Sequence, residues 1–459
     1  MASKPGKSRW ADTEEDAAYE AELKKQREEK KRQKAEKARI QQERKQKEAK
    51  DAEEELTEHE DRPPKRRRVT PEPNAAETVA ERKLLKVSLS NWAPCRSDRN
   101  YQKLNDIEEG AYGFVSRARD TATSRIVALK RLKTDENDRN GFPVTAMREI
   151  KILRACDHRN VVKLLETVVS PLSAPPSVSL VLEFVEHDLR GVLEDMTETF
   201  LPSEIKRLML QLASGLAYIH DHYIIHRDLK TSNLLLNNKG QLKIADFGMA
   251  RYTSDPPPDN LTTLVVTLWY RSPELLLGAK TYTAAIDMWS VGCIFAELLE
   301  RKPLFAGSAE AEQISKIFEV VGLPSDETWP GFRRLPNAKV LKLPRKPGPV
   351  EDRIRPRFTD LTKAGCSLMR DLLSLNPEAR PTAKEMLQHP YFAESPKPKA
   401  EALFPTFPSK ANQERRPRRE PHAPARGERA AELGEVDVSH LFGSRDSEAK
   451  GAGFRLKMG

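Results

Sequence analysis

The sequence predicts an α+β protein with two unequal lobes and a charged tail at each end. Between Tyr101 and about Leu182, apolar residues alternate or run at strand length, with turn residues between them, which predicts an antiparallel sheet. Beyond Leu189 they recur three and four residues apart, which predicts a mainly helical lobe. Lys, Arg, Glu, Ala and Pro dominate before Tyr101 and after Phe392, so the core must form between these two residues.

Composition narrows the class of protein. The chain has 459 residues, of which 38% are hydrophobic, enough for a sizeable core. The formal net charge of +9 combines many charges of both signs, which favours weak attraction to polyanions over specific nucleic-acid binding. Four cysteines lie far apart without a C-x-x-C pair, so we expect neither a zinc site nor a disulfide framework. Without an apolar run of membrane-spanning length or a secretory signal, we expect a soluble intracellular protein with no membrane association.

The tails are predicted from charge and proline content. Residues 1–97 form a charged, largely disordered or partly helical tail, because residues 13–58 pair opposite charges at helical spacing but have almost no apolar seam for a coiled coil. Residues 63–69, Pro-Pro-Lys-Arg-Arg-Arg-Val, are typical of a nuclear import signal or of a basic linker, and we expect the protein in the nucleus and also in the cytoplasm. Residues 393–459 are rich in Pro and Arg and are expected to be disordered, although residues 436–442 are apolar enough to dock as a short arm.

The smaller lobe, residues 101–183, contains a glycine-rich turn and a strand lysine. Gly110-Ala111-Tyr112-Gly113-Phe114-Val115 lies between strand-like runs, where glycines let backbone amides approach phosphate oxygens. The pattern is incomplete, since Glu108 stands at the first glycine, and alone it fits a plain hairpin turn as well. Val127-Ala128-Leu129-Lys130 is typical of a strand whose ammonium reaches nucleotide phosphates, and Glu149 on the following helix is the expected carboxylate partner.

The larger lobe, residues 188–392, carries the chemistry. Residues 225–233, the candidate catalytic loop, read Ile-His-Arg-Asp-Leu-Lys-Thr-Ser-Asn, and Asp246-Phe247-Gly248 follows. Phosphoryl transfer from a magnesium nucleotide to a hydroxyl requires these groups. Asp228 would orient the hydroxyl and accept its proton, and Lys230 would neutralise charge on the phosphoryl group in transfer. Asn233 and Asp246 would each hold a Mg²⁺ ion.

These motifs, in this order, identify residues 101–392 as a protein-kinase catalytic domain with a bilobal fold. Residues 141–150 resemble the cyclin-contacting helix of cyclin-dependent kinases, in the PITSLRE version, and residues 185–189 and 265–280 are similar to the same subgroup of the CMGC kinases. The resemblance implies a Ser/Thr kinase that uses ATP and Mg²⁺, is proline-directed, and acts in the cell cycle or in transcription and RNA processing. It also implies a cyclin at helix 143–150, protein substrates and an upstream activating kinase.

The resemblance assigns the nucleotide site position by position. Leu182 would be the gatekeeper, the backbones of Glu183 and Val185 would bond adenine, and Asp188 would lie near the ribose. The full expected set is Ile107, Gly110, Gly113, Val115, Ala128, Lys130, Glu149, Glu183, Val185 and Asp188.

Control sites follow from the same resemblance. Thr262 would be the activating phosphothreonine, and its phosphate would pair with Arg148, Arg227 and Arg251. Tyr112 would be an inhibitory phosphotyrosine, or else a structural aromatic over the ribose, and Ala111 replaces the second phosphorylatable residue of many relatives. We expect the catalytic loop to stay idle until a partner pushes the Glu149 helix inward.

Other residues are expected to be structural. Glu274 and Arg380 resemble a buried ion pair, Asp287 should anchor the backbone of the catalytic loop, and His226 should pack in the core. Two alternatives remain: a pseudokinase scaffold that acts through its tails, and a nucleic-acid binding protein that uses its basic flanks. The chemically competent residue at every catalytic position argues against the first.

Overall fold

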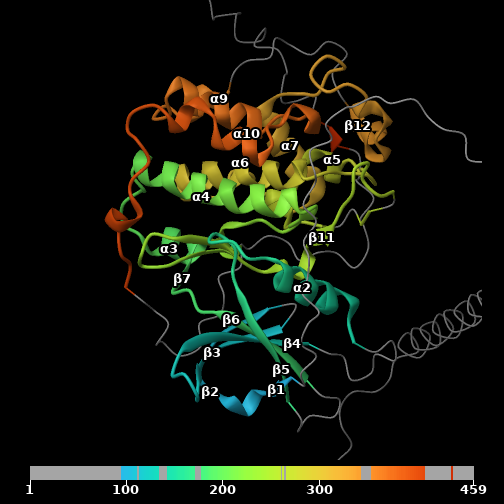
Figure 1. Cartoon of the computed structure of the whole chain (residues 1–459). Helices are drawn as coiled ribbons and strands as arrows, with labels where there is room; N and C mark the ends of the chain where they lie inside the picture. Colours follow the sequence, from blue (N-terminus) through green and yellow to red (C-terminus); the bar gives the residue numbers. More distant parts are fainter. Residues whose placement is uncertain are drawn as a thin grey trace, which may run out of the picture. The chain divides into compact units, whose positions relative to one another are not determined.

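The computed structural model describes residues 95–110, 113–133, 142–170, 177–259, 261–262, 265–342, 353–408 and 436–437 (Figure 1). The predictions for residues 1–94, including the basic cluster at residues 63–69, lie outside the described residues. So do those for Ala111 and Tyr112.

The smaller lobe is a six-stranded sheet with one helix beside it. Its strands are β1 (Arg96–Ser97), β2 (Tyr101–Gly110), β3 (Gly113–Asp120), β4 (Ile126–Leu132), β5 (Leu164–Ser170) and β6 (Ser177–Glu183), in the order β1-β5-β6-β4-β3-β2. All neighbouring pairs are antiparallel except β1 with β5. The helix is α2 (Val144–Ala155). Inward-facing side chains such as Ala118, Val127 and Val181 form a small core.

The chain joins this sheet earlier than expected. β1 lies within residues that we assigned to the N-terminal tail, and it adds a parallel strand to the edge of the sheet beside β5. Arg96 explains the docking, since its guanidinium lies 3.2 Å from Glu166 and 3.6 Å from Asp120 and 5.6 Å from the centre of the Tyr101 ring.

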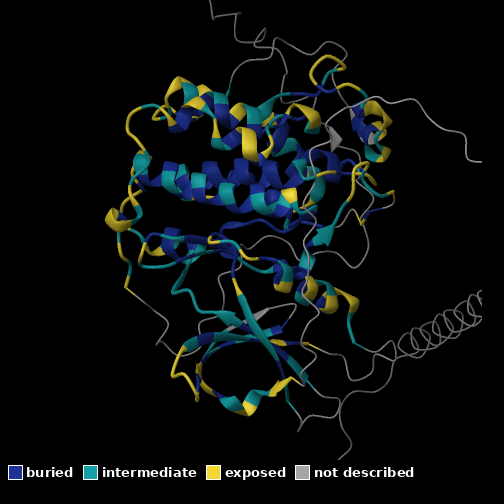
Figure 2. Cartoon of the chain, viewed as in Figure 1, coloured by how far each residue is buried: buried dark blue, intermediate teal, exposed yellow. Residues whose placement is uncertain are grey.

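The larger lobe is built around two long helices. Its helices are α3 (Leu189–Asp195), α4 (Pro202–Asp221), α5 (Pro273–Leu276), α6 (Ala285–Glu300), α7 (Glu310–Val321), α8 (Ile354–Arg357), α9 (Lys363–Leu372) and α10 (Ala383–Leu387). α4 begins with Pro202 at its first position, and the Glu204 carboxylate accepts the Leu201 N–H at 2.8 Å, as expected of a capped helix start. α4 and α6 are mostly buried at the centre of the lobe (Figure 2). None of the described helices is long and apolar enough to cross a membrane.

Short strands of the larger lobe shape the site. β7 (His187–Asp188), β9 (Leu234–Leu236) and β10 (Leu242–Ile244) form a sheet in the order β10-β9-β7, and β8 (Ile224–Ile225) pairs with β11 (Arg251–Tyr252). β12 (Leu341–Lys342) pairs in parallel with β13 (Val436–Asp437), so part of the expected C-terminal arm does dock. Single-turn 3-10 helices fill many of the connections.

Two expectations about the larger lobe can be compared with the structure. The predicted ion pair is confirmed: Arg380 donates two hydrogen bonds to the Glu274 carboxylate, each 2.7 Å long, and both side chains are buried. The expectation of disorder after Phe392 is wrong for residues 393–408, which pack on α4. Hydrogen bonds from Lys206 to the backbone and the burial of Phe404 hold this stretch, and local composition does not reveal either.

Candidate active site

One buried carboxylate, that of Asp287, anchors the backbone of the catalytic loop. Asp287 on α6 accepts the backbone N–H groups of His226 and Arg227, both at 2.9 Å, and lies 2.9 Å from the His220 ring nitrogen. Burial disfavours its ionised form, but the hydrogen bonds from the His220 ring and the His226 backbone N–H lower the pKa of Asp287 overall. The anchoring role predicted for Asp287 is therefore confirmed. The bonds help to hold Arg227 in a left-handed conformation with φ 64°.

His226 lies in the core, as expected. Its ring is fully buried against Phe247, with 4.9 Å between ring centres, and its Nε2 atom lies 3.0 Å from the Ala245 carbonyl oxygen. The imidazole thus supports the residues before Asp246.

Asp228, the candidate base, is held on both oxygens. Thr267 donates its hydroxyl to Oδ1 at 2.9 Å and its backbone N–H to the same atom at 3.1 Å. Lys230 Nζ lies 3.5 Å from Oδ2, and Asn233 Nδ2 donates to the Asp228 carbonyl oxygen at 2.7 Å. The carboxylate is therefore fixed beside an ammonium, as proton acceptance next to a transferring phosphoryl group requires.

The β9–β10 hairpin brings the two candidate metal ligands together. Asn233 immediately precedes β9, and Asp246 follows β10 with a left-handed φ of 61°. Because Asn233 turns its Nδ2 toward Asp228, its amide oxygen faces the other way. One carboxylate and one amide oxygen suit Mg²⁺ held mainly by nucleotide phosphates. Among the described residues no group of three or more His, Cys, Asp or Glu could hold a metal ion.

Lys130 links both lobes at this point. Its ammonium lies 2.7 Å from Glu149 on α2 and 2.9 Å from Asp246. Burial works against a charged ammonium, but the Asp246 and Glu149 carboxylates outweigh it and raise the pKa of Lys130, so the group stays protonated. The pair with Glu149 forms within the single chain. The structure thus differs from the expectation that a partner must first push the helix inward.

The remaining candidate nucleotide residues line neighbouring strands. Val115 stands opposite Lys130, Ala128 opposite the expected gatekeeper Leu182, and Gly110 opposite Gly113. A Cβ atom at Gly113 would collide with the Arg131 carbonyl oxygen, so the turn requires glycine there. Ile107 lies on β2, before the turn.

The segment between the lobes places Glu183, Val185 and Asp188 in succession. The Glu183 carboxylate accepts the Lys163 backbone N–H at 2.7 Å and lies 2.8 Å from Lys243 Nζ, which fixes the end of β6. Asp188 caps α3 by accepting the Gly191 N–H at 2.6 Å. The sequence analysis placed Asp188 near the ribose and missed this cap. An Asp directly before the first residue of a helix is a typical cap signal and could have revealed it.

The three arginines expected around Thr262 lie near one another. Burial and then the charges of Arg251 and Arg227 lower the pKa of Arg148. Thr262 is exposed, and its carbonyl oxygen accepts the Tyr282 hydroxyl at 2.8 Å. That hydroxyl in turn accepts a bond from Arg227 Nη1 at 2.9 Å. Tyr282 thus links the backbone of Thr262 to Arg227, one of the three cations that would suit a phosphate dianion.

Three residues of the site were missed as functional groups. Thr267 lies within the motif at residues 265–280 but was not assigned a contact with Asp228, and Tyr282 and Arg271 were not assigned roles. Their contacts join segments far apart in the sequence, so only the fold brings them to the site.

This fold and this arrangement of Lys130, Asp228 and Asp246 define a protein kinase. The family model described as the protein kinase domain matches residues 101–392, more than half of the chain. Serine/threonine-protein kinase ppk23 of Schizosaccharomyces pombe is 52% identical over 320 residues, which cover 70% of this chain and 79% of the relative.

Cyclin-dependent kinases are similar over a comparable length. Cyclin-dependent kinase G-2 of Oryza sativa is 48% identical over 362 residues, and Cyclin-dependent kinase 11B of Homo sapiens is 46% identical over 384 residues. These matches cover 76% and 81% of this chain, but only 50% and 47% of the relatives, so the chain spans about half their length. The chain belongs to the protein kinase family, in its cyclin-dependent CMGC branch. The predicted class of ATP-dependent serine/threonine kinase is confirmed by these relatives, and nothing in them favours a pseudokinase.

Proposed function

We propose that this protein transfers the γ-phosphate of ATP to serine or threonine hydroxyls that precede proline in other proteins, with a cyclin bound at α2 and with phosphorylated Thr262. The observation that carries the proposal is the joint placement of Lys130, Asp228 and Asp246 around one site, each paired with the groups that phosphoryl transfer needs.

The transfer step follows from the contacts of Asp228. The substrate hydroxyl gives its proton to the Asp228 carboxylate as its oxygen bonds to phosphorus, and the bond from phosphorus to the bridging oxygen of ADP breaks. Thr267 keeps Oδ1 in place, and Lys230 beside Oδ2 stabilises negative charge on the phosphoryl oxygens. Asn233 and Asp246 would hold magnesium, which supplies charge neutralisation at the phosphates when bound. Lys130 would orient the α and β phosphates.

The preference for proline rests on Val266. This β-branched residue has a left-handed φ of 66°, and Arg271 Nη2 donates to its carbonyl oxygen at 3.1 Å. That oxygen is therefore already bonded and does not suit a substrate backbone N–H placed beside it. Proline has no N–H to leave unpaired, whereas another residue would lose about 1–3 kcal/mol. We expect a serine followed by proline to react about 5-fold to 150-fold faster than one followed by alanine.

The partner proposal rests on the outer face of α2. Val144 and Met147 are 60% and 52% exposed, whereas Glu149 on the same helix is buried against Lys130. Exposed apolar side chains on a helix that holds a catalytic ion pair suit a protein partner. Because two of the relatives are named cyclin-dependent kinases, we infer that this partner is a cyclin. Because the pair already forms in the single chain, the cyclin would stabilise α2 rather than move it. Met147→Glu should then lower activity and cyclin binding together.

The activation proposal rests on the three arginines. A phosphate on Thr262 would pair with Arg148 on α2, Arg227 in the catalytic loop and Arg251 on β11, and so would join three elements. An upstream kinase would add it. The basic cluster at residues 63–69 supports nuclear import, which a fluorescent fusion with Arg66, Arg67 and Arg68 changed to alanine would test by its distribution in cells.

The decisive experiment measures phosphate incorporation into peptide substrates by the full chain with its cyclin. Wild-type protein should label a Ser-Pro peptide and Asp246→Asn should not. Equal labelling by both would refute the mechanism. Labelling by neither, with nucleotide still bound, would support the pseudokinase alternative. Thr262→Ala should lower activity and Arg148→Ala should lower it in the same way, since both remove one side of the same contact.

A further inference from the structure

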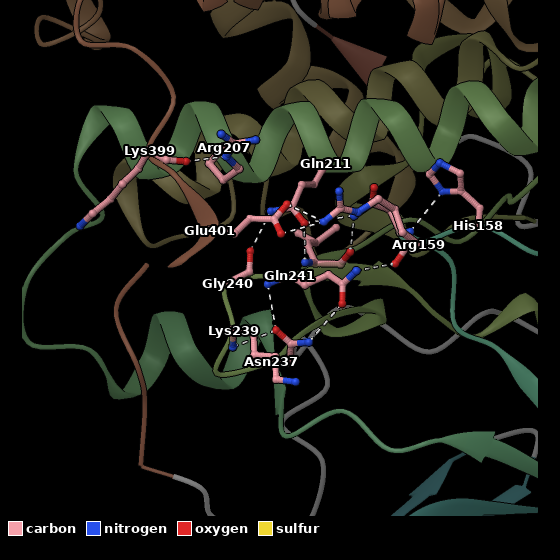
Figure 3. A network of polar contacts seen from close by, with 12 residues as sticks. His158, Arg159, Arg207, Gln211, Asn237, Lys239, Gly240, Gln241, Lys399 and Glu401 are labelled. Atoms are coloured by element: carbon pink, nitrogen blue, oxygen red, sulfur yellow. Dashed lines mark hydrogen bonds and ion pairs between the residues drawn. The ribbon is translucent and has the colours of Figure 1, made fainter. Parts of the chain in front are cut away.

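Residues 395–408 form a strap that runs from the end of the larger lobe along α4 toward the β9–β10 turn. The Lys399 N–H donates to the Ser203 carbonyl oxygen at 2.9 Å, and Arg207 Nε donates to the Lys399 carbonyl oxygen at 2.5 Å. Lys206 Nζ, nearly fully buried, donates to the Pro396 carbonyl oxygen at 3.0 Å. These backbone contacts fix the path of the strap along α4, and Figure 3 shows the one between Arg207 and Lys399.

The strap then covers the β9–β10 turn. Phe404 is 5% exposed and packs on Phe200, with ring centres 6.0 Å apart. Gly240 in the turn has a φ of +73°, and a Cβ atom there would collide with the Cβ of Phe404 and lie 2.7 Å from the Glu401 carbonyl oxygen. The Phe407 N–H donates to Asn238 Oδ1 at 2.9 Å. The turn and the strap are therefore in direct contact on two sides.

The strap also binds the loop between α2 and β5. Glu401 accepts two hydrogen bonds from Arg159, at 2.8 Å and 2.7 Å, and Gln241 Nε2 donates to the Arg159 carbonyl oxygen at 3.2 Å (Figure 3). The same loop bonds β10, because the Ile244 N–H donates to the Asn160 carbonyl oxygen at 2.8 Å. The strap, this loop and the β9–β10 hairpin thus form one connected unit.

The other end of the hairpin holds the candidate magnesium ligands. Asn233 enters β9 and Asp246 leaves β10, and the three cross-strand pairs between Leu234 and Ile244 make the hairpin a short, regular ladder. Each strand is only about 10 Å long, so a tilt of the turn also displaces the other end of the hairpin, where the candidate ligands lie.

We propose that the strap positions the magnesium-nucleotide site by holding the β9–β10 hairpin, with Phe404 and Glu401 as positioning residues. This inference rests on the proposed function of Asn233 and Asp246. Neither strap residue touches the site itself. Without the Phe404 or Glu401 side chain the turn can move, and the separation of the two ligand oxygens is then less well fixed. The affinity for magnesium therefore falls although the protein still folds.

The test measures how Mg²⁺ concentration controls binding of a fluorescent, non-hydrolysable ATP analogue to the full chain with its cyclin. Phe404→Ala should raise the Mg²⁺ midpoint by about 3-fold to 10-fold, less than the 10–100-fold typical of groups bonded directly to a metal ligand. Hydrogen exchange should speed up at residues 237–241. Leu403→Ala is the matched control, since Leu403 is 68% exposed on the same strap, and its midpoint should equal that of the wild type.

A second variant keeps the test decisive if Phe404→Ala does not fold. Glu401→Arg should raise the midpoint, and the added change Arg159→Glu should restore it, because the charges are then exchanged across the same contact. A midpoint within about twofold of wild type in folded Phe404→Ala, or no rescue by the charge exchange, would overturn the inference. Nucleotide binding by the wild type that does not depend on magnesium would instead refute the proposed function, and the inference with it.

Discussion

The hydroxyl of Thr267 donates to Asp228 Oδ1 at 2.9 Å, and Thr267→Ala removes this bond while keeping the backbone N–H that lies 3.1 Å from the same oxygen. Asp228 is 2% exposed, so water cannot easily replace the lost donor. A hydrogen bond to a charged group contributes about 1.5–3 kcal/mol, and each 1.36 kcal/mol changes a rate about tenfold. Since the N–H remains, we expect kcat to fall by about 10-fold to 100-fold.

The assay is steady-state phosphorylation of a Ser-Pro peptide, with kcat and KM for ATP measured separately. Thr267→Ser retains the hydroxyl and should keep kcat within about threefold of the wild type, with KM for ATP unchanged in both variants. Thr267→Ala with wild-type kcat would refute the argument that this hydroxyl fixes the base. Equal loss in the serine variant would show that the methyl group, not the hydroxyl, is what matters.

Three further predictions concern stability, pH and metal. Glu274→Gln should lower the free energy of unfolding by about 3–5 kcal/mol in urea denaturation, because it leaves the buried Arg380 without its charge partner, whereas Asp326→Asn in an exposed pair should cost less than about 1 kcal/mol. Equal costs would contradict the burial argument. Burial and the charges of Arg159 and Lys243 lower the pKa of His158 from 6.5, and its Nδ1 accepts the Asn160 N–H. The unfolded chain therefore binds a proton at this residue more readily than the folded chain does. The free energy of unfolding should then fall as the pH drops below 6.5. His158→Asn should weaken this fall in unfolding midpoints compared at about pH 7.5 and about pH 5.5, and parallel curves would count against it. Excess EDTA should abolish phosphate transfer and added Mg²⁺ should restore it, because an ion that only Asn233 and Asp246 bind from the protein can be removed by a chelator. Transfer that persists in EDTA would exclude a role for Asn233 and Asp246 as magnesium ligands.

The strap shows where local sequence stops being informative. Its residues are rich in Pro and Lys, a composition that predicts disorder when no partner surface is known. Glu401 contacts Arg159, a residue 242 positions away, and Lys399 contacts α4 nearly 200 positions away. No period or motif within the strap encodes these partners, so only the folded lobe could show that it is ordered.

The sequence by itself determined the kinase class, the bilobal α+β fold and the identity of the central groups Lys130, Asp228 and Asp246. It could do so because each motif is short and contiguous, and its chemistry depends on residue types at fixed local spacing. Tertiary structure alone decided how these groups are held. Thr267 reaches Asp228 across 39 positions, Tyr282 bridges Thr262 and Arg227, and the Lys130–Glu149 pair is closed in the single chain. Such contacts depend on long-range packing, for which neighbouring residues in the sequence carry no signal.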